Sequence, residues 1–76
     1  MTQEEKLARL QEIFREVLDQ PELHLTEDFS MADCAAWDSV ATVQIVLAAE
    51  SAFGVRVPTE SVATLQRVGE LLALLP

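Results

Sequence analysis

Residues 37–58, WDSVATVQIVLAAESAFGVRVP, decide the fold that this chain of 76 residues can adopt. Asp38 is a good helix N-cap, so Ser39 and Val40 would form the first turn of a helix. Gly54 predicts its end, because glycine adopts the left-handed conformation at little cost. An apolar stripe at helical spacing is predicted from Val40, Val43, Val46, Leu47 and Phe53. Because Ile45, Ala48 and Ala49 widen this apolar sector, we expect more than one side of the helix to be covered or to contact a partner.

The segments on either side also predict helices. The first spans about 2–19: Thr2 and Glu5 have the spacing of a capping box, and Pro21 ends it. Its apolar stripe comprises Leu7, Leu10, Phe14, Val17 and Leu18. A short turn of helix is expected over 60–63, capped by Thr59, and a last helix over about 67–75. The inward face of that last helix is predicted to hold Val68, Leu71, Leu72 and Leu75.

In residues 20–37 the apolar residues follow no sustained periodic spacing, so this segment is expected to form one long loop. Leu23, Leu25, Phe29 and Met31 are spaced as anchors to a core, and Trp37 is interpreted as a further loop anchor. No segment alternates with period two, so no sheet is expected. The sequence thus predicts an all-α fold. It is a small four-helix bundle, with three main helices, a short third helix and a long loop between helices 1 and 2, in a single domain over 1–76.

The charge of the chain excludes several functions. Lys plus Arg number 5 against 13 Asp plus Glu, a formal net charge of −8. This charge argues against binding to nucleic acid or to an anionic membrane and favours basic partner surfaces. No stretch approaches the roughly 18 apolar residues of a membrane span, and no secretory signal is visible, so we expect a cytoplasmic protein. The single cysteine, Cys34, can form neither an internal disulfide nor a zinc cage, and no metal site is predicted.

Ser39 is the residue that carries the functional prediction. A small domain buries only about 60% of its unfolded surface, so an elaborate enzyme site is difficult to build, and a binding or carrying role is favoured. A serine in the first turn of a helix lies near unpaired N–H groups and the positive end of the helix dipole, where a phosphate is stabilised. Such a hydroxyl suits a phosphodiester link to a long prosthetic arm. Taken alone, however, Asp-Ser before an apolar run is also an ordinary helix cap.

From Asp38 the chain reads DSVATVQIVLAAESAFGVRVPTESVATLQRVGELLALL, which resembles the acyl carrier protein family. That family has an Asp-Ser-Leu-like motif at the start of its second helix. The resemblance implies that Ser39 carries 4'-phosphopantetheine, transferred from coenzyme A by a phosphopantetheinyl transferase, and that the arm holds an acyl group as a thioester. It implies a non-catalytic carrier whose other partners are a loading enzyme and a downstream synthase or transferase. Trp37 before the motif resembles carriers of specialised pathways, such as polyketide synthesis, more than the housekeeping fatty-acid carrier.

The second helix departs from the family in having few acids, since Ala41 and Gln44 are neutral and Glu50 is followed by Ser51 and Ala52. We therefore expect docking to depend less on charge than is usual. The predicted partner-binding residues are Asp38, Val40, Ala41, Gln44, Glu50 and Arg56. The chain is expected to be a monomer.

Three alternatives remain open from the sequence. A peptidyl or aminoacyl carrier would share the fold, the serine and the arm. An unmodified acidic module could bind a basic partner without Ser39. A hydrolase built on Ser39 would need His24 as its base, with Asp38 or Asp28 to orient it, and no Gly-x-Ser-x-Gly elbow is present.

Overall fold

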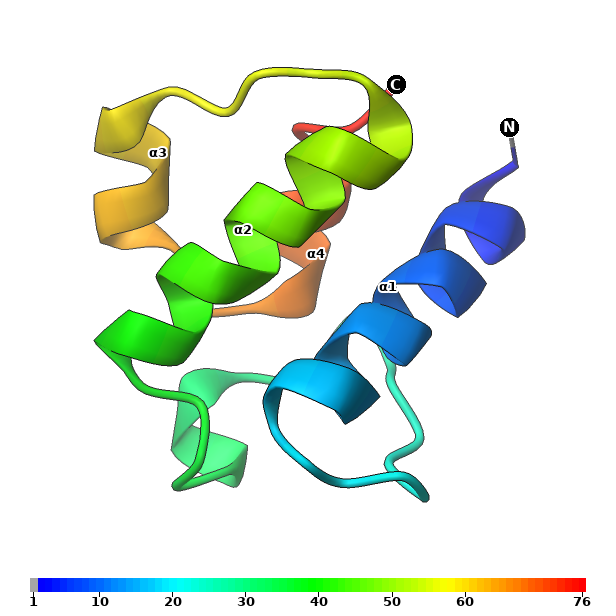
Figure 1. The fold of residues 1–76 in the computed structure, drawn as a ribbon, viewed down its shortest axis with the longest axis vertical. Helices are drawn as coiled ribbons and strands as arrows, with labels where there is room; N and C mark the ends of the chain where they lie inside the picture. Colours follow the sequence, from blue (N-terminus) through cyan, green and yellow to red (C-terminus); the bar gives the residue numbers. More distant parts are fainter. Residues whose placement is uncertain (1) are drawn as a thin grey trace.

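The computed structural model describes residues 2–76 and shows four α-helices there: α1 (Gln3–Val17), α2 (Ser39–Phe53), α3 (Thr59–Thr64) and α4 (Val68–Leu72). A one-turn 3-10 helix, η1 (Met31–Asp33), lies within the long loop. The two long helices run in opposite directions and pack against each other, while α4 contacts α1 and α3 contacts α2 (Figure 1). The described residues contain no β-strand, so the predicted all-α four-helix bundle is confirmed.

Local signals place the ends of the helices close to the predicted positions. Thr2 caps α1, and the N–H of Glu5 donates to its Oγ1 at 3.1 Å while the N–H of Thr2 donates to Glu5 Oε1 at 3.2 Å. Gly54 ends α2 with φ 66°, a left-handed conformation as predicted. The first helix is shorter than the predicted 2–19, because Asp19 takes φ 55° and turns the chain before Pro21 is reached.

The two short helices differ from their predicted bounds. α3 starts at Thr59 with Pro58 in the N-cap position, so the prediction that Thr59 caps it was wrong by one residue. α4 covers only Val68–Leu72, and Ala73 and Leu74 form turns rather than extending the helix to Leu75. The inward residues predicted for the last helix are nevertheless all buried.

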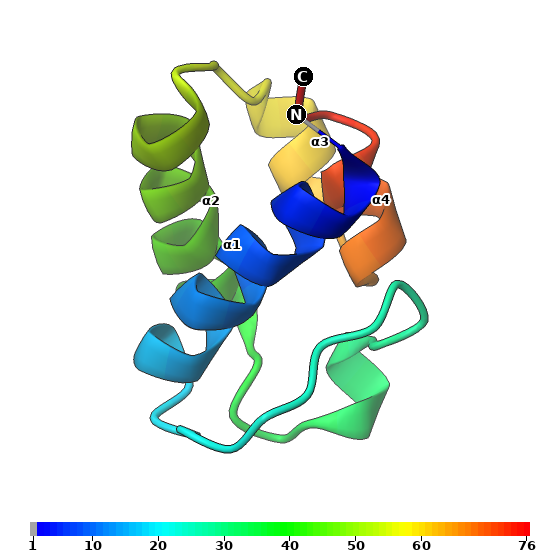
Figure 2. The ribbon, with the colours of Figure 1, turned by 90° about the vertical axis from the view of Figure 1, so that its right-hand side faces the viewer.

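The long loop lies across the end of the bundle where α1 stops and α2 begins (Figure 2). It is tied to the start of α4: the N–H of Met31 donates to the carbonyl oxygen of Gln66 at 2.9 Å, and the N–H of Val68 donates to that of Phe29 at 2.9 Å. The N–H of Gly69 donates to the Glu27 carbonyl oxygen at 3.0 Å, and a Cβ on Gly69 would lie 3.3 Å from that oxygen. A close backbone approach therefore accounts for a glycine that weakens the helix.

Candidate site at the start of α2

Ser39 is exposed and is the first residue of α2, preceded by the N-cap Asp38. The N–H of Ala41 donates to Asp38 Oδ1 at 2.9 Å, which fixes the first turn, as the sequence predicts. The N–H groups of Ser39 and Val40 belong to the helix start, where no preceding helical carbonyl can accept from them. An anion bonded to the Ser39 hydroxyl would meet these donors and the positive end of a helix of 15 residues.

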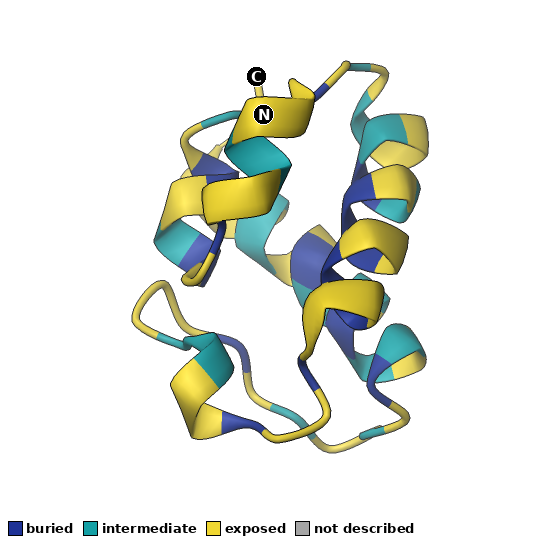
Figure 3. Cartoon of the chain, turned by 90° about the vertical axis from the view of Figure 1, so that its left-hand side faces the viewer, coloured by how far each residue is buried: buried dark blue, intermediate teal, exposed yellow. Residues whose placement is uncertain are grey.

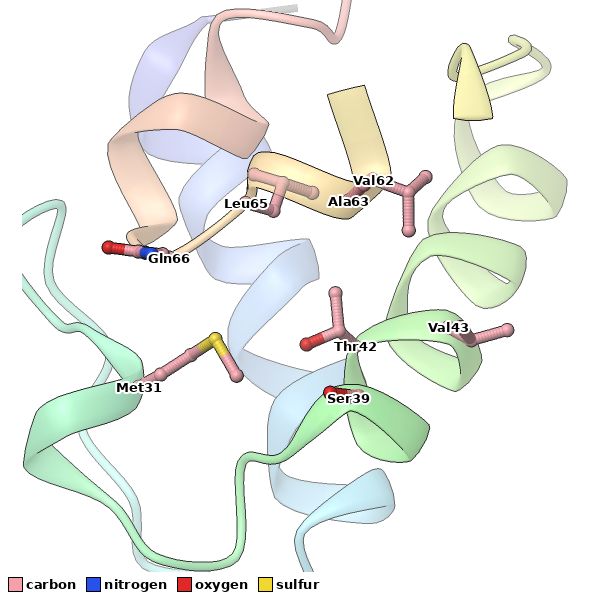
Figure 4. Close-up of a pocket in the computed structure, with 8 residues that line it drawn as sticks. All are labelled: Met31, Ser39, Thr42, Val43, Val62, Ala63, Leu65 and Gln66. Carbon is pink, nitrogen blue, oxygen red and sulfur yellow. The ribbon is translucent and has the colours of Figure 1, made fainter. Parts of the chain in front are cut away.

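A pocket of about 330 Å³ opens directly beside Ser39 (Figure 4). It lies between the first two turns of α2, the end of α3 with the segment that follows it, and η1. Its lining includes Met31, Thr42, Val43, Val62 and Leu65. The site therefore combines an exposed hydroxyl with a partly apolar recess, and its residues come from three separate parts of the chain.

Trp37 holds the loop against the core, as predicted. Its ring is buried, lies parallel to Phe29 with centroids 5.7 Å apart, and meets Phe14 edge to face at 5.0 Å. Its indole Nε1–H donates to Thr42 Oγ1 at 2.8 Å. Trp37, two positions before Ser39, is thus held by contacts on several sides. These contacts hold the start of α2 in place.

The remaining predicted partner residues do not all lie on one surface. Val40, Gln44 and Arg56 are exposed, whereas Ala41 is buried in the core, so its side chain cannot belong to a contact surface. Glu50 is half-buried, and its Oε2 accepts from the N–H of Val57 at 2.7 Å, which holds the segment after α2. That contact gives Glu50 a structural role in this molecule.

The buried face of α2 differs from the stripe that the sequence predicts. It consists of Ala41, Thr42, Ile45, Val46 and Ala49. Of the predicted stripe, only Val46 is buried, while Val40, Val43 and Leu47 are 66%, 49% and 60% exposed. These three are the exposed large hydrophobic residues of the chain from 2 to 76, and exposed residues follow the outer side of α2 (Figure 3). Sequence reasoning missed Val43 and Leu47 as surface residues, although the width of the apolar sector indicated a second covered side.

His24 is not part of this site. It is exposed and lines another depression, formed by the loop and the N-terminal half of α1, together with Leu7, Gln11 and Glu27. Ser39 and His24 thus line different pockets, and the arrangement a serine hydrolase needs is not formed. Cys34 is buried, with Gln20 Nε2 donating to its sulfur at 3.4 Å.

The charges lie mainly away from the site. Residues 1–38 hold ten acidic and three basic residues, and residues 39–76 hold three and two. Hydrogen bonds from the N–H groups of Gln66 and Arg67 lower the pKa of Glu70, and the backbone N–H and then the side chain of Thr2 lower the pKa of Glu5. Both carboxylates cap helices rather than serve the pocket. In residues 2–76 no three His, Cys, Asp or Glu side chains gather as a metal site would require.

Comparison with known proteins identifies the family of the chain. A family model described as the phosphopantetheine attachment site matches residues 8–75. The chain belongs to this family. It is a non-catalytic carrier whose cofactor is covalently attached phosphopantetheine.

Curated relatives of the carrier are acyl carrier proteins. One from Acidothermus cellulolyticus is 39% identical over 70 residues, covering 92% of this chain and 83% of the relative. The meromycolate extension acyl carrier protein of Mycolicibacterium smegmatis is 38% identical over 72 residues, covering 95% of this chain and 73% of the relative. The carrier is therefore an acyl carrier protein by family, as its sequence indicates.

A solved structure from Mycobacterium tuberculosis, assigned as an acyl carrier protein, has the same fold. Its TM-score is 0.80 at 14% identity, over 91% of this chain and 92% of that one. None of the carrier's helices within 2–76 combines the length and apolarity needed to cross a lipid bilayer.

Proposed function

We propose that Ser39 is the residue of this acyl carrier that bears the 4'-phosphopantetheine arm, and that a phosphopantetheinyl transferase installs it from coenzyme A. The observation that carries the proposal is the exposed position of Ser39 in the first turn of α2, beside a partly apolar pocket. The arm, when bound, supplies the thiol that forms the thioester. The protein contributes the hydroxyl, the helix start that stabilises a phosphate, and the partly apolar recess next to it.

Other serines of the chain fit a phosphate less well. Ser51 is also exposed on α2, but it lies in the last turn, where the negative end of the helix dipole disfavours an anion. Ser30 Oγ lies 3.2 Å from Asp33 Oδ2 and donates to it, so its hydroxyl proton is in use and a carboxylate is adjacent. Ser61 belongs to the short helix α3.

Incubation with coenzyme A and a promiscuous transferase, followed by intact mass measurement, tests the attachment. Wild type and Ser51→Ala should each gain one phosphopantetheinyl group, and Ser39→Ala should gain none. A gain on Ser39→Ala, or no gain on wild type, contradicts the proposal. Retained function of Ser39→Ala in the host would instead favour an unmodified interaction module.

We further propose that partner enzymes contact the outer face of α2, formed by Val40, Val43, Gln44 and Leu47, which we call the docking face. These residues follow helical spacings of three and four from the residue next to Ser39. Three apolar side chains are left exposed here and are not used by the core, a feature that marks interaction surfaces. Asp38 and Arg56 are the exposed predicted charges nearby. The absence of acids at the start of α2 favours docking by apolar contact.

The partners on this face would be the transferase, the enzyme that loads the acyl group and the enzyme that receives it. All three must reach the arm at Ser39, so a face that begins at Val40 lies within the contact area of each. The family relatives support an acyl cargo over an aminoacyl one. We propose that the carrier acts as a monomer.

A further inference from the structure

The position of the Ser39 hydroxyl depends on the backbone of the first turn of α2. Ser39 is exposed, so packing against other side chains does little to fix it. The turn is closed at the Asp38 carbonyl oxygen, which accepts from both the N–H and the Oγ1–H of Thr42, each at 2.9 Å. Figure 4 shows Ser39 and Thr42 on the side of α2 that faces the pocket. The place of the Ser39 hydroxyl is therefore coupled to the rotamer of Thr42.

Thr42 is in turn held by Trp37. The Nε1–H of Trp37 donates to Thr42 Oγ1 at 2.8 Å, so this one hydroxyl accepts from the indole and donates to the Asp38 carbonyl oxygen. The two bonds together hold the Thr42 side chain in one rotamer. Trp37 and Thr42 are 4% and 5% exposed, so the bond between them is shielded from water. We call these two side chains the Trp37–Thr42 pair.

The indole of Trp37 is fixed by its aromatic neighbours. It lies parallel to Phe29, with ring centroids 5.7 Å apart, and meets Phe14 edge to face at 5.0 Å. Phe14 has no exposed surface, so a rotation of the indole would disturb a close-packed core. The Trp37–Thr42 pair thus connects a rigid aromatic cluster to the turn that carries Ser39.

Packing alone does not require this pair to be polar. Phenylalanine at position 37 and valine at position 42 would keep an aromatic ring and a β-branched side chain there. Replacing both partners of a buried hydrogen bond by apolar groups of similar shape can be nearly neutral for stability. The hydrogen bond adds a direction to the packing, because it sets how the first turn of α2 is oriented relative to the core.

The transfer of the arm depends on that orientation. The Ser39 oxygen must bond to the phosphorus that carries pantetheine in coenzyme A, while the bond from that phosphorus to the bridging oxygen breaks and adenosine bisphosphate leaves. The hydroxyl proton passes to a base of the transferase. The attacking and leaving oxygens must be in line, and a misplacement of about 1 Å can lower the rate about a hundredfold. A hydroxyl that the carrier itself holds in place reduces this misplacement.

We infer that the Trp37–Thr42 pair positions the Ser39 hydroxyl for attack on coenzyme A in the complex with the transferase. The inference rests on the proposed attachment of the arm at Ser39. Trp37 is a positioning residue, since it acts through Thr42 and the Asp38 carbonyl oxygen. The docking face lies on the exposed side of α2, so loss of the pair should lower kcat for the transfer and leave KM for the carrier near its wild-type value.

Trp37→Phe is the main test of this role. It keeps an aromatic ring in the cluster and removes the indole donor, and Trp37 does not line the pocket. With coenzyme A and a promiscuous transferase, we expect kcat to fall about tenfold and KM for the carrier to stay within about twofold of wild type. Intact mass of wild type and Ser39→Ala, measured first, shows whether the arm is attached at Ser39. A failure of the attachment is thereby recognised separately.

Thr42 gives a second measurement of the same effect, which decides where Trp37→Phe does not fold. Thr42→Val keeps the β-branched shape and removes the hydroxyl, so it should lower kcat at least as far as Trp37→Phe. Thr42→Ser keeps the hydroxyl and should recover most of that loss. In the double variant, kcat should be no lower than in Thr42→Val, because the two side chains act through one bond. The chain has one tryptophan, and its indole N–H signal in proton NMR should move upfield in Thr42→Val.

Leu72→Val is the matched control for stability. It removes buried volume in α4 and leaves both members of the Trp37–Thr42 pair in place. It should therefore lower the melting temperature and leave kcat for the transfer unchanged.

Three results overturn the inference. A kcat within about twofold of wild type in both Trp37→Phe and Thr42→Val shows that the pair does not position the hydroxyl. A raised KM with unchanged kcat shows that the pair serves docking instead. An equal fall in kcat for Leu72→Val shows that the transfer responds only to the stability of the fold.

Discussion

The helices α1 and α2 have the same length, 15 residues each, but expose different surfaces. α1 buries Leu10 and Phe14 and exposes mainly charged side chains, among them Glu4, Glu12 and Glu16. α2 buries Ala41, Ile45 and Ala49 and exposes valine and leucine. The proposed contacts with partner enzymes would account for the exposed apolar face of α2, whereas solvation accounts for the charged face of α1.

The largest expected effect is a loss of stability, and it should differ between a variant on the buried side of α1 and one on the exposed side of α2. Phe14→Ala removes a fully buried ring that packs on Phe29 and Trp37, and it should lower the free energy of unfolding by about 3–5 kcal/mol. Val40→Ala, at a site that is 66% exposed, should change it by no more than about 0.5 kcal/mol. Urea unfolding followed by far-UV circular dichroism measures both. Similar losses in the two variants would mean that the docking face stabilises the fold and is not free for partners.

The same comparison shows what the sequence could and could not predict. The stripe of α1 has one apolar side and one charged side, so its inward face, with Leu10, Phe14 and Leu18, follows directly from the spacing. α2 is apolar on both sides, so the helical spacing of its apolar residues does not show which side is buried. The buried side combines the small Ala41 and Ala49 with the larger Ile45 and Val46, so the packing of the other elements against α2 makes the choice, and the helical spacing does not show it.

The candidate site was predictable where it depends on local signals and not where it depends on packing. The cap at Asp38 and the exposed hydroxyl of Ser39 follow from adjacent residues. The pocket, and the bond from Trp37 to Thr42 behind it, require η1, α2 and α3 to meet in space. η1 itself was missed because a single 3-10 turn has no period to detect.

The next largest effect concerns docking. The double variant Val40→Gln, Leu47→Gln keeps the charge and the helix but removes apolar contact area. It should lower the transferase kcat/KM for the carrier about tenfold, equivalent to about 1.4 kcal/mol. Glu12→Arg reverses a charge on the exposed side of α1 and should change kcat/KM less than about twofold. If Glu12→Arg has the greater effect, docking depends on the acidic surface of α1 instead of the docking face.

A smaller effect is expected at the cap of α2. Asp38→Ala removes the oxygen that accepts from the Ala41 N–H, so it should cost about 1 kcal/mol and lower the melting temperature by about 4–8 °C. Asp38→Asn keeps an acceptor oxygen at the same place and should melt close to wild type. The pair also separates the cap from the charge in transferase assays. A loss of stability in Asp38→Asn equal to that in Asp38→Ala would show that the negative charge, not the hydrogen bond, stabilises the start of α2.

The smallest effect is the pH dependence of the carboxylates at the starts of α1 and α4. Glu70 Oε1 accepts from the N–H groups of Gln66 and Arg67 at 2.8 and 3.0 Å, and these bonds lower the pKa of Glu70 below its ordinary value of 4.5. A carboxyl whose pKa is lower in the folded state contributes stability that is present above the unfolded pKa and is lost as the pH falls through the folded pKa. The start of α4 should therefore keep its cap at neutral pH and lose it only below pH 4.5, and the same holds for Glu5 at the start of α1.

Carbon-detected NMR titration of the Glu70 side chain should give a midpoint below 4.5. In Glu70→Gln, the amide protons of Gln66 and Arg67 should lose the acid-dependent shift that wild type shows. Since neither carboxylate touches the pocket, loading of Ser39 should not follow this titration. A midpoint at or above 4.5 would show that the two N–H groups do not hold the carboxylate in the folded state.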